Sequence, residues 1–171
     1  MVPSAPMAAD PLSDEDRAYV EERLGRPPRC EFGVAARNAA GRPTVISNPP
    51  FLDDGTPMPT RFWLIDRDLH KRIAGLESAG GVDEVEELLG LDRLAEVHAA
   101  YAAERDALIS ADHTGPRPSG GVGGTRVGVK CLHTHYAHYL ATGHDPVGEW
   151  VQQRLDEADA ARSATATGAP S

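Results

Sequence analysis

The sequence predicts an α+β fold in which a small N-terminal antiparallel sheet, a hairpin plus a third strand, packs against a larger C-terminal helical part. Three observations support this fold class. Short strand-like runs separated by turn residues cluster before Asp66, apolar residues recur at helical spacing after it, and no later strand alternates with the helices. This order argues against a doubly wound βαβ fold, and a chain of 171 residues has the length of one domain.

We expect a single domain over residues 13–157, with disordered tails at residues 1–12 and 158–171. The first tail is rich in Pro, Ala and Ser, the second in Ala, Thr, Ser and Gly, and neither has a periodic apolar face. The start of the chain lacks a signal-peptide pattern, and no stretch is long and apolar enough to span a bilayer. We therefore expect a cytoplasmic protein without membrane contact, in which Cys30 and Cys131 stay reduced.

The first half of the domain is predicted as one helix followed by three strands. Ser13 has the spacing of a helix cap, and Gly25 is a natural helix end before two prolines. The segment 38–41 reads as the turn of a hairpin, and the third strand is expected to add to that hairpin. The predicted bounds are 14–24 for the helix and 31–37, 44–47 and 60–65 for the strands.

The second half is predicted as helices. The recurrence of Leu69, Ile73 and Leu76 indicates the first, which ends at a glycine pair, Gly80 and Gly81. A loop at 113–124 leads into a helix rich in Cys and His. The other predicted helices span 82–89, 91–109 and 147–156.

Potential chemistry concentrates in residues 120–143, where a glycine-rich loop leads into a helix with a cysteine and three of the seven histidines. On an ideal helix Cys131, His135 and His138 share one face, at i, i+4 and i+7, whereas His133 lies near the opposite face. Thiolate and imidazole ligands suit Zn²⁺, and three of them with an open fourth position suit a catalytic ion. A fourth ligand would make the site structural, and it could be a carboxylate or one of His70, His98, His113, His144 and Cys30.

The same residues have a structural interpretation, which we favour over metal binding. A cysteine in a helix is most often a small buried hydrophobe, and histidines near a helix C-terminus favour its negative end. The string Cys-x-His-x-His-x-x-His also matches no standard zinc-finger spacing. Zinc is therefore the alternative, with Cys131, His133, His135 and His138 as its candidate ligands.

The glycine loop predicts a possible anion site, because backbone N–H groups at a helix N-terminus bind anions and cationic side chains lie nearby. The loop is not a Walker A motif, since Val129 and Lys130 follow Gly128 where that motif has Lys and Ser or Thr. A flexible connector is the alternative that we favour. The candidate anion-binding residues are Gly121, Gly123, Gly124, Arg126 and Lys130.

Two functions are compatible with these features. The net charge of −9 argues against a nucleic-acid binder. The first hypothesis is a small cytoplasmic accessory or interaction protein with a protein partner, centred on the glycine loop and the Cys/His helix. The alternative is a metal-dependent hydrolase acting on a phosphorylated or other anionic substrate, with the ion on the Cys/His helix and the anion at Arg126 and Lys130.

One set of short stretches is specific in its order along the chain: 25–29, 54–60, 62–64, 72–80, 119–124, 129–133 and 137–138. Together they resemble the domain-of-unknown-function family number five hundred and one, found chiefly in actinobacteria. The resemblance covers about residues 24–148. It implies no established activity, but family members often sit beside genes for a septum-formation initiator and an exopolyphosphatase, which implies a link to cell division.

The chain also departs from the family pattern. That pattern has His-Arg-Cys-Pro-Cys-Gly at the hairpin turn matched here by residues 36–41, and a cysteine at the position of Asp66. The resemblance therefore implies a zinc or iron–sulfur site in the family. In this chain Asn38 and Ala40 stand at the positions of the two turn cysteines. Either the metal is lost in this chain and the fold persists on packing, or His135 and another residue replace the missing thiolates. The resemblance favours His133 and His138 as ligands, whereas helix geometry favours His135 over His133.

Overall fold

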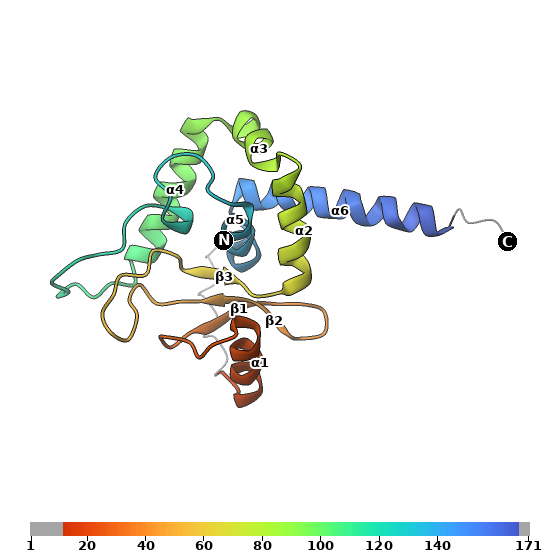
Figure 1. Cartoon of the computed structure of the whole chain (residues 1–171). Helices are drawn as coiled ribbons and strands as arrows, with labels where there is room; N and C mark the ends of the chain where they lie inside the picture. Colours follow the sequence, from red (N-terminus) through yellow and green to blue (C-terminus); the bar gives the residue numbers. More distant parts are fainter. Residues whose placement is uncertain (1–11, 168–171) are drawn as a thin grey trace, which may run out of the picture.

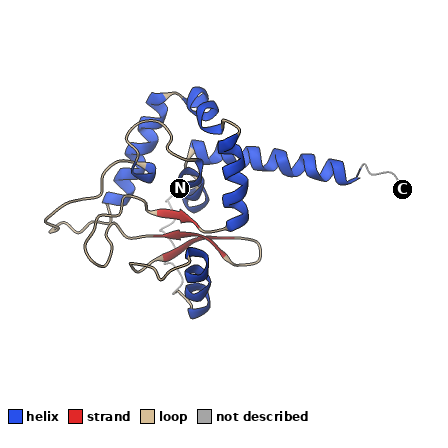
Figure 2. Ribbon diagram, in the orientation of Figure 1, coloured by secondary structure: helices blue, strands red, loops and turns tan. Residues whose placement is uncertain are grey.

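The computed structural model describes residues 12–167 and confirms the predicted α+β fold (Figures 1 and 2). Within these residues a three-stranded antiparallel sheet precedes five of the six α-helices. The predicted tail segment 1–11 and residues 168–171 lie outside the described residues. The elements are α1 (Asp14–Leu24), β1 (Gly33–Arg37), β2 (Pro43–Ser47), β3 (Phe62–Leu64), α2 (Arg67–Ser78), α3 (Gly81–Leu89), α4 (Leu91–Asp106), the 3₁₀ turn η1 (Val122–Gly124), α5 (Leu132–Thr142) and α6 (Pro146–Thr167).

The sheet has the order β1-β2-β3, so the hairpin and its added third strand form as predicted. Val45 of β2 pairs with Leu64 of β3, and Ile46 pairs with Val34 of β1. Successive residues of a strand face opposite sides of a sheet, and here both Val45 and Ile46 are buried. Val45 packs against residues of α4 and α5 and Ile46 against α1, so helices cover both faces of the sheet (Figure 1).

Helix α5 lies at the centre of the molecule and packs against β3, α2 and α6. Its Leu132 and Tyr136 join the largest apolar cluster, to which α2, α3, α4 and α6 all contribute. Helix α6 crosses α5 at Gly148, where an added Cβ would lie 2.2 Å from Cβ of Tyr139 and 2.6 Å from the carbonyl oxygen of His135. A glycine at this position therefore permits the closest approach of the two helices.

The predicted helices differ from the structure in α4, which ends at Asp106 and not at residue 109, and in α5 and α6. Helix α5 begins at Leu132, and Cys131 is its N-cap residue with an extended backbone, φ −157° and ψ 151°. Helix α6 continues to Thr167, whereas we expected it to end at Asp156 and a disordered tail to begin at 158. Its last three turns are exposed, and they are stabilised by the helix propensity of alanine and by an ion pair of 2.8 Å between Asp159 and Arg72 of α2. No helix within residues 12–167 has the length and apolar character needed to cross a membrane.

Candidate metal centre and the buried histidine network

The structure divides the four predicted metal-site residues into two groups. Cys131 and His133 lie beside Glu77 at the start of α5, whereas His135 and His138 are buried and contact Asp145. The expected shared face of Cys131, His135 and His138 does not form, because Cys131 precedes the helix and its extended backbone does not follow the helical period.

The first group, which we call the Glu77 cluster, consists of Glu77, Cys131 and His133. One possible ligand atom from each residue lies within 4.8 Å of the other two. The side chains of His133 and Glu77 are 14% and 26% exposed, so the cluster is half-buried. Glu77, in the last turn of α2, accepts a hydrogen bond of 2.6 Å from the N–H of Leu132 and thereby caps the positive end of α5.

His133 is oriented by both of its ring nitrogens. Its Nε2 lies 2.9 Å from the carbonyl oxygen of His70 and must donate to it, since a carbonyl only accepts. Its Nδ1 lies 3.1 Å from Oε1 of Glu77. In the neutral ring Nδ1 therefore presents a lone pair toward a carboxylate, and a cation between them, a proton or a metal ion, relieves the repulsion. A histidine that donates its second N–H to a carbonyl is typical of metal sites.

The protonation of the Glu77 cluster follows from the same contacts. Burial on its own would lower the pKa of His133, but the hydrogen bonds to Cys131 and to the His70 carbonyl outweigh it, so the pKa is raised. Burial would raise the pKa of Cys131, but hydrogen bonds with His133 and Thr134 outweigh it, so this pKa is lowered. Both shifts favour a Cys131 thiolate beside a positively charged His133. The thiolate is the form of cysteine that binds metals.

The positions where the family pattern has further cysteines lie away from the Glu77 cluster. Asp66 caps the N-terminus of α2, and Glu77 follows it by eleven residues, about 16 Å along the helix. Asn38 closes the hairpin turn by accepting from the N–H groups of Ala40 and Arg42, and this end of the hairpin lies beside α1. The replaced turn cysteines therefore take no ligand away from the Glu77 cluster.

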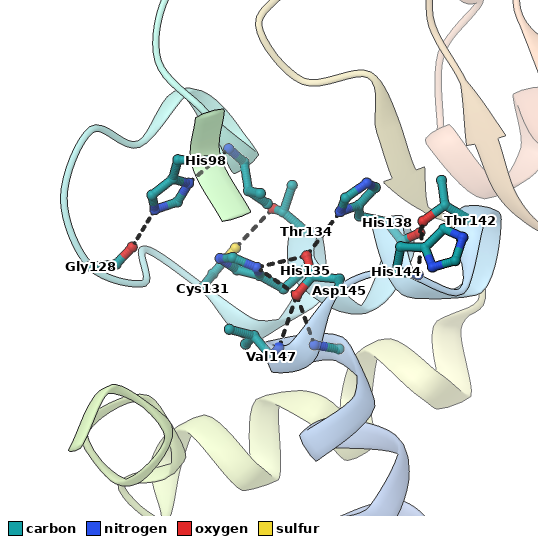
Figure 3. Close-up of polar contacts among 12 residues, drawn as sticks. His98, Gly128, Cys131, Thr134, His135, His138, Thr142, His144, Asp145 and Val147 are labelled. Atoms are coloured by element: carbon teal, nitrogen blue, oxygen red, sulfur yellow. Dashed lines mark hydrogen bonds and ion pairs between the residues drawn. The ribbon is translucent and has the colours of Figure 1, made fainter. Parts of the chain in front are cut away.

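The second group is a buried network around Asp145 (Figure 3). Its carboxylate, 0% exposed, accepts from Nδ1 of His135 at 2.9 Å and from Nδ1 of His138 at 3.0 Å. It also accepts from the N–H groups of Val147 and Gly148 and so caps α6. Burial would raise the pKa of Asp145, but the hydrogen bonds from the two histidines outweigh it and hold this pKa far below its usual range.

The two histidines of this network differ at Nε2. In His138 it lies 3.4 Å from a carboxylate oxygen of Glu104, so both ring nitrogens face acidic groups. Burial opposes the charged form, but the hydrogen bonds to Asp145 and Glu104 raise the pKa of His138 to about 8. In His135 Nε2 is buried and has no hydrogen-bond partner among the described residues. The network therefore stabilises packing between α4, α5 and α6 through a charged His138.

Two side chains of α4 hold the glycine loop. His98 donates from Nε2 to the carbonyl of Gly128 at 2.7 Å and accepts from the N–H of Val122 at Nδ1, so its ring is neutral. An added Cβ at Gly121 would lie 2.3 Å from Cβ of His98, which requires glycine there. Arg105, 1% exposed, donates to two carbonyl groups at the start of the loop and to one in the segment before β3. Its acceptors are Pro59 at 3.3 Å, Pro118 at 3.3 Å and Gly120 at 2.9 Å.

The predicted anion-binding residues fall into two sets. The N–H groups of Gly121 and Gly124 donate within the loop, to the carbonyls of Thr125 and Gly121. Arg126 and Lys130 are exposed, and Arg126 borders a shallow groove of about 450 Å³ beside the loop. Two of the amides expected to bind an anion are therefore already used, and anion binding at this loop stays a prediction that depends mainly on Arg126.

Sequence reasoning missed the acidic partners Glu77, Glu104 and Asp145 and the buried Arg105. One of them had a readable signal, since Asp145 followed by a proline is the signature of an N-cap with proline at the first helical position. Glu77 and Glu104 resemble ordinary charged positions of amphipathic helices, and only their tertiary contacts distinguish them.

The fold and the site define an α+β protein with a half-buried Glu/Cys/His cluster at the junction of two helices. The chain belongs to the family described as "Protein of unknown function (DUF501)", whose model matches residues 34–153, more than two thirds of the chain. No curated protein and no solved structure matches the chain. The family resemblance is thus confirmed, and because the family description names no activity, a function must be argued from the site.

Proposed function

We propose that this protein binds one zinc ion at the Glu77 cluster. The observation that carries the proposal is the convergence of a carboxylate, a thiol and an imidazole within 4.8 Å, with the imidazole held by the His70 carbonyl. These are the three ligand types that zinc accepts, at bond lengths of about 2.0–2.3 Å. Small movements of the three side chains suffice to bring them to one ion.

A zinc ion held by three protein ligands keeps a fourth position for water, whose pKa such an ion lowers to about 7. This supports the hypothesis of a metal-dependent hydrolase. Lys130, exposed and next to Cys131 in the chain, offers a positive charge for an anionic substrate. Both cysteines are free thiols, which supports a cytoplasmic location, where thiols remain reduced.

The test is the metal content of protein purified without a histidine tag. We expect about one zinc per chain, and replacing a ligand in Cys131→Ser or Glu77→Gln is expected to weaken zinc binding at least about 100-fold, since changes even outside the ligand shell weaken metal binding 10–100-fold. A chelator should lower the Tm of the wild type, because the ion binds only the folded state.

Matched controls separate the ligands from other residues of the same kind. Cys30→Ala removes the second thiol, and Glu87→Gln removes an exposed carboxylate on α3, and both variants should keep the wild-type zinc content. A wild-type protein that folds without metal and shows the same Tm with and without chelator would contradict the proposal.

An accessory role through a protein partner is the second candidate. Leu88, Leu91 and Val127 are 66%, 57% and 74% exposed. Leu88 is in the last turn of α3 and Leu91 is the first residue of α4, and Val127 precedes the loop segment that Glu86 of α3 binds. Exposed apolar groups gathered in one region favour a binding surface. The genes that often lie beside those of family members favour a partner connected with cell division.

This candidate makes its own prediction. The triple variant Leu88→Glu, Leu91→Glu, Val127→Glu should lose a partner protein that co-purifies with the wild type from its native cells. Its Tm should stay within about 2 °C of the wild type, because exposed substitutions change stability little. If wild type and variant recover the same proteins and sediment identically, this region is not a binding surface.

A further inference from the structure

A pocket of about 180 Å³ lies at the C-terminal end of α1, on the face of the sheet that α1 covers. Its walls are mostly apolar and include Leu24, Ile46, Leu52, Met58 and Trp63. A dry cavity of about 150 Å³ takes one benzene ring, whereas sites for larger ligands span about 300–1,000 Å³. The pocket therefore has room for a single ring or branched chain with a small substituent.

A buried polar side chain lines this pocket. Asn48 is 4% exposed, and its Nδ2 donates to the Thr60 carbonyl at 3.4 Å. Its Oδ1 has only a weak contact of 3.9 Å with the thiol of Cys30. A carboxamide offers two N–H donors and two lone pairs, so Asn48 retains capacity for another hydrogen bond. A ligand with one polar atom can use that capacity without leaving a buried group unpaired.

The charged side chains that line the pocket are both arginines. Arg29 is paired with Asp54 at 3.0 Å. Arg26 lies over the ring of Trp63, with 5.9 Å from its guanidinium carbon to the ring centroid, and has no ion pair within residues 12–167 at the distances that define one. Asp54 offsets the charge of Arg29, and the carboxylates of Asp53 and Glu31 lie near Cys30, so the one lining charge without an ion pair among the described residues is that of Arg26, which is complementary to a single anionic group.

We propose that this pocket binds a small carboxylate that carries one apolar ring or branched chain. The carboxylate pairs with the guanidinium of Arg26, and the apolar part packs against Trp63 and Met58. Asn48 accepts or donates a hydrogen bond to any polar atom on the buried part. This site is separate from the Glu77 cluster, since α1 covers one face of the sheet and α5 the other (Figure 1).

The experiment is calorimetric titration of the full chain with phenylacetate. We expect a Kd of about 1 mM, which is typical of a ligand with about ten heavy atoms. Phenylacetamide, which lacks the charge, should bind at least about tenfold more weakly, the loss expected for one charge-assisted hydrogen bond. Acetate keeps the charge but lacks the ring, and it should also bind at least about tenfold more weakly because the apolar burial of the ring is lost.

Variants locate the binding. Arg26→Gln should weaken phenylacetate about tenfold, whereas Arg93→Gln, which removes an exposed arginine on α4, should bind as the wild type does. Met58→Trp fills the pocket and should abolish binding while the fold, followed by circular dichroism, stays intact. Equal affinity for phenylacetate and phenylacetamide, no binding of phenylacetate at all, or binding that survives Met58→Trp would overturn the proposal.

Discussion

The variant Asp145→Ala is expected to lose about 3–5 kcal/mol of the free energy of unfolding, the range for breaking a buried ion pair. The carboxylate is completely buried and accepts four hydrogen bonds, two from imidazoles and two from backbone N–H groups of α6. Its removal leaves the charged His138 with one acidic neighbour, Glu104, and leaves α6 without its cap. Urea unfolding followed by circular dichroism measures the loss.

The pH dependence of stability distinguishes this network from simple packing. The pKa of His138 is raised from 6.5 to about 8 in the folded state, so its contribution is fully present below about pH 6.5 and is lost as the pH rises through about 8. A shift of about 1.5 units corresponds to about 2 kcal/mol. The lowered pKa of Asp145 has the opposite sense, and its contribution is present above about pH 3.8 and falls in acid. Wild-type stability should therefore be highest between about pH 4 and 6.5.

In Asp145→Ala the loss of stability between pH 6.5 and 8.5 should shrink to well under half, because the main partner of His138 is gone. The matched control is Asp156→Ala, which removes an exposed aspartate of α6 that bonds only to Gln152 among the contacts of the described residues. It should change the free energy of unfolding by less than about 0.5 kcal/mol and keep the wild-type pH profile. A wild-type stability that is flat from pH 6 to 9 would mean that His138 is not charged.

The sequence predicted the fold well because the fold depends on periodicity. The short apolar run of Val45 and Ile46 between turn segments and the helical spacing of Leu69, Ile73 and Leu76 are local signals, and apolar packing reinforces each of them. The end of α6 was less predictable, since an Ala-rich segment without an apolar face was expected to be disordered, and its contact with Arg72 joins residues 87 positions apart.

The candidate site was only partly predictable, because its residues come from several helices. Cys131 and His133 were expected as ligands from their types, but Cys131 was placed inside the helix, whereas it is the extended N-cap residue, and this gave the wrong partners. Glu77, 56 positions before His133, has no local signal that relates it to the cysteine. A helix boundary is the least certain feature of a sequence-based prediction, and a site that spans such a boundary inherits that uncertainty.

Arg105 exemplifies a residue that sequence reasoning assigns to the surface and the fold buries. It lies in the last turn of α4 among alanines and acidic residues, where a charged side chain usually faces solvent. In the structure its guanidinium is among the largest fully buried groups of the described residues and donates to the carbonyls of Pro59, Pro118 and Gly120. It therefore links the segment before β3 to the start of the glycine loop, which no local pattern could indicate.

We expect Arg105→Ala to lose about 3–5 kcal/mol of the free energy of unfolding. Each buried carbonyl left without a donor costs about 1–3 kcal/mol, and the vacated volume adds the cost of a cavity. Arg105→Lys should lose less, because an ammonium keeps the charge but cannot reach three separate acceptors as the planar guanidinium does. Hydrogen exchange of the loop amides, read by mass spectrometry, should accelerate in both variants under conditions where the helices remain protected.

The control for this prediction lies on the same helix. Arg93→Ala removes an exposed arginine whose ion pair with Glu96 is within one turn of α4, and such pairs contribute only a few tenths of a kcal/mol. If Arg105→Ala resembled Arg93→Ala in both stability and loop exchange, the guanidinium would be dispensable and the loop would be held by His98 alone. If Arg105→Lys instead matched the wild type, charge rather than the three directed hydrogen bonds would fix the loop. We predict that Arg105→Ala loses more free energy of unfolding than Arg105→Lys, and that Arg105→Lys loses more than the Arg93→Ala control. This order follows only if the planar geometry of the Arg105 guanidinium positions the glycine loop against α4.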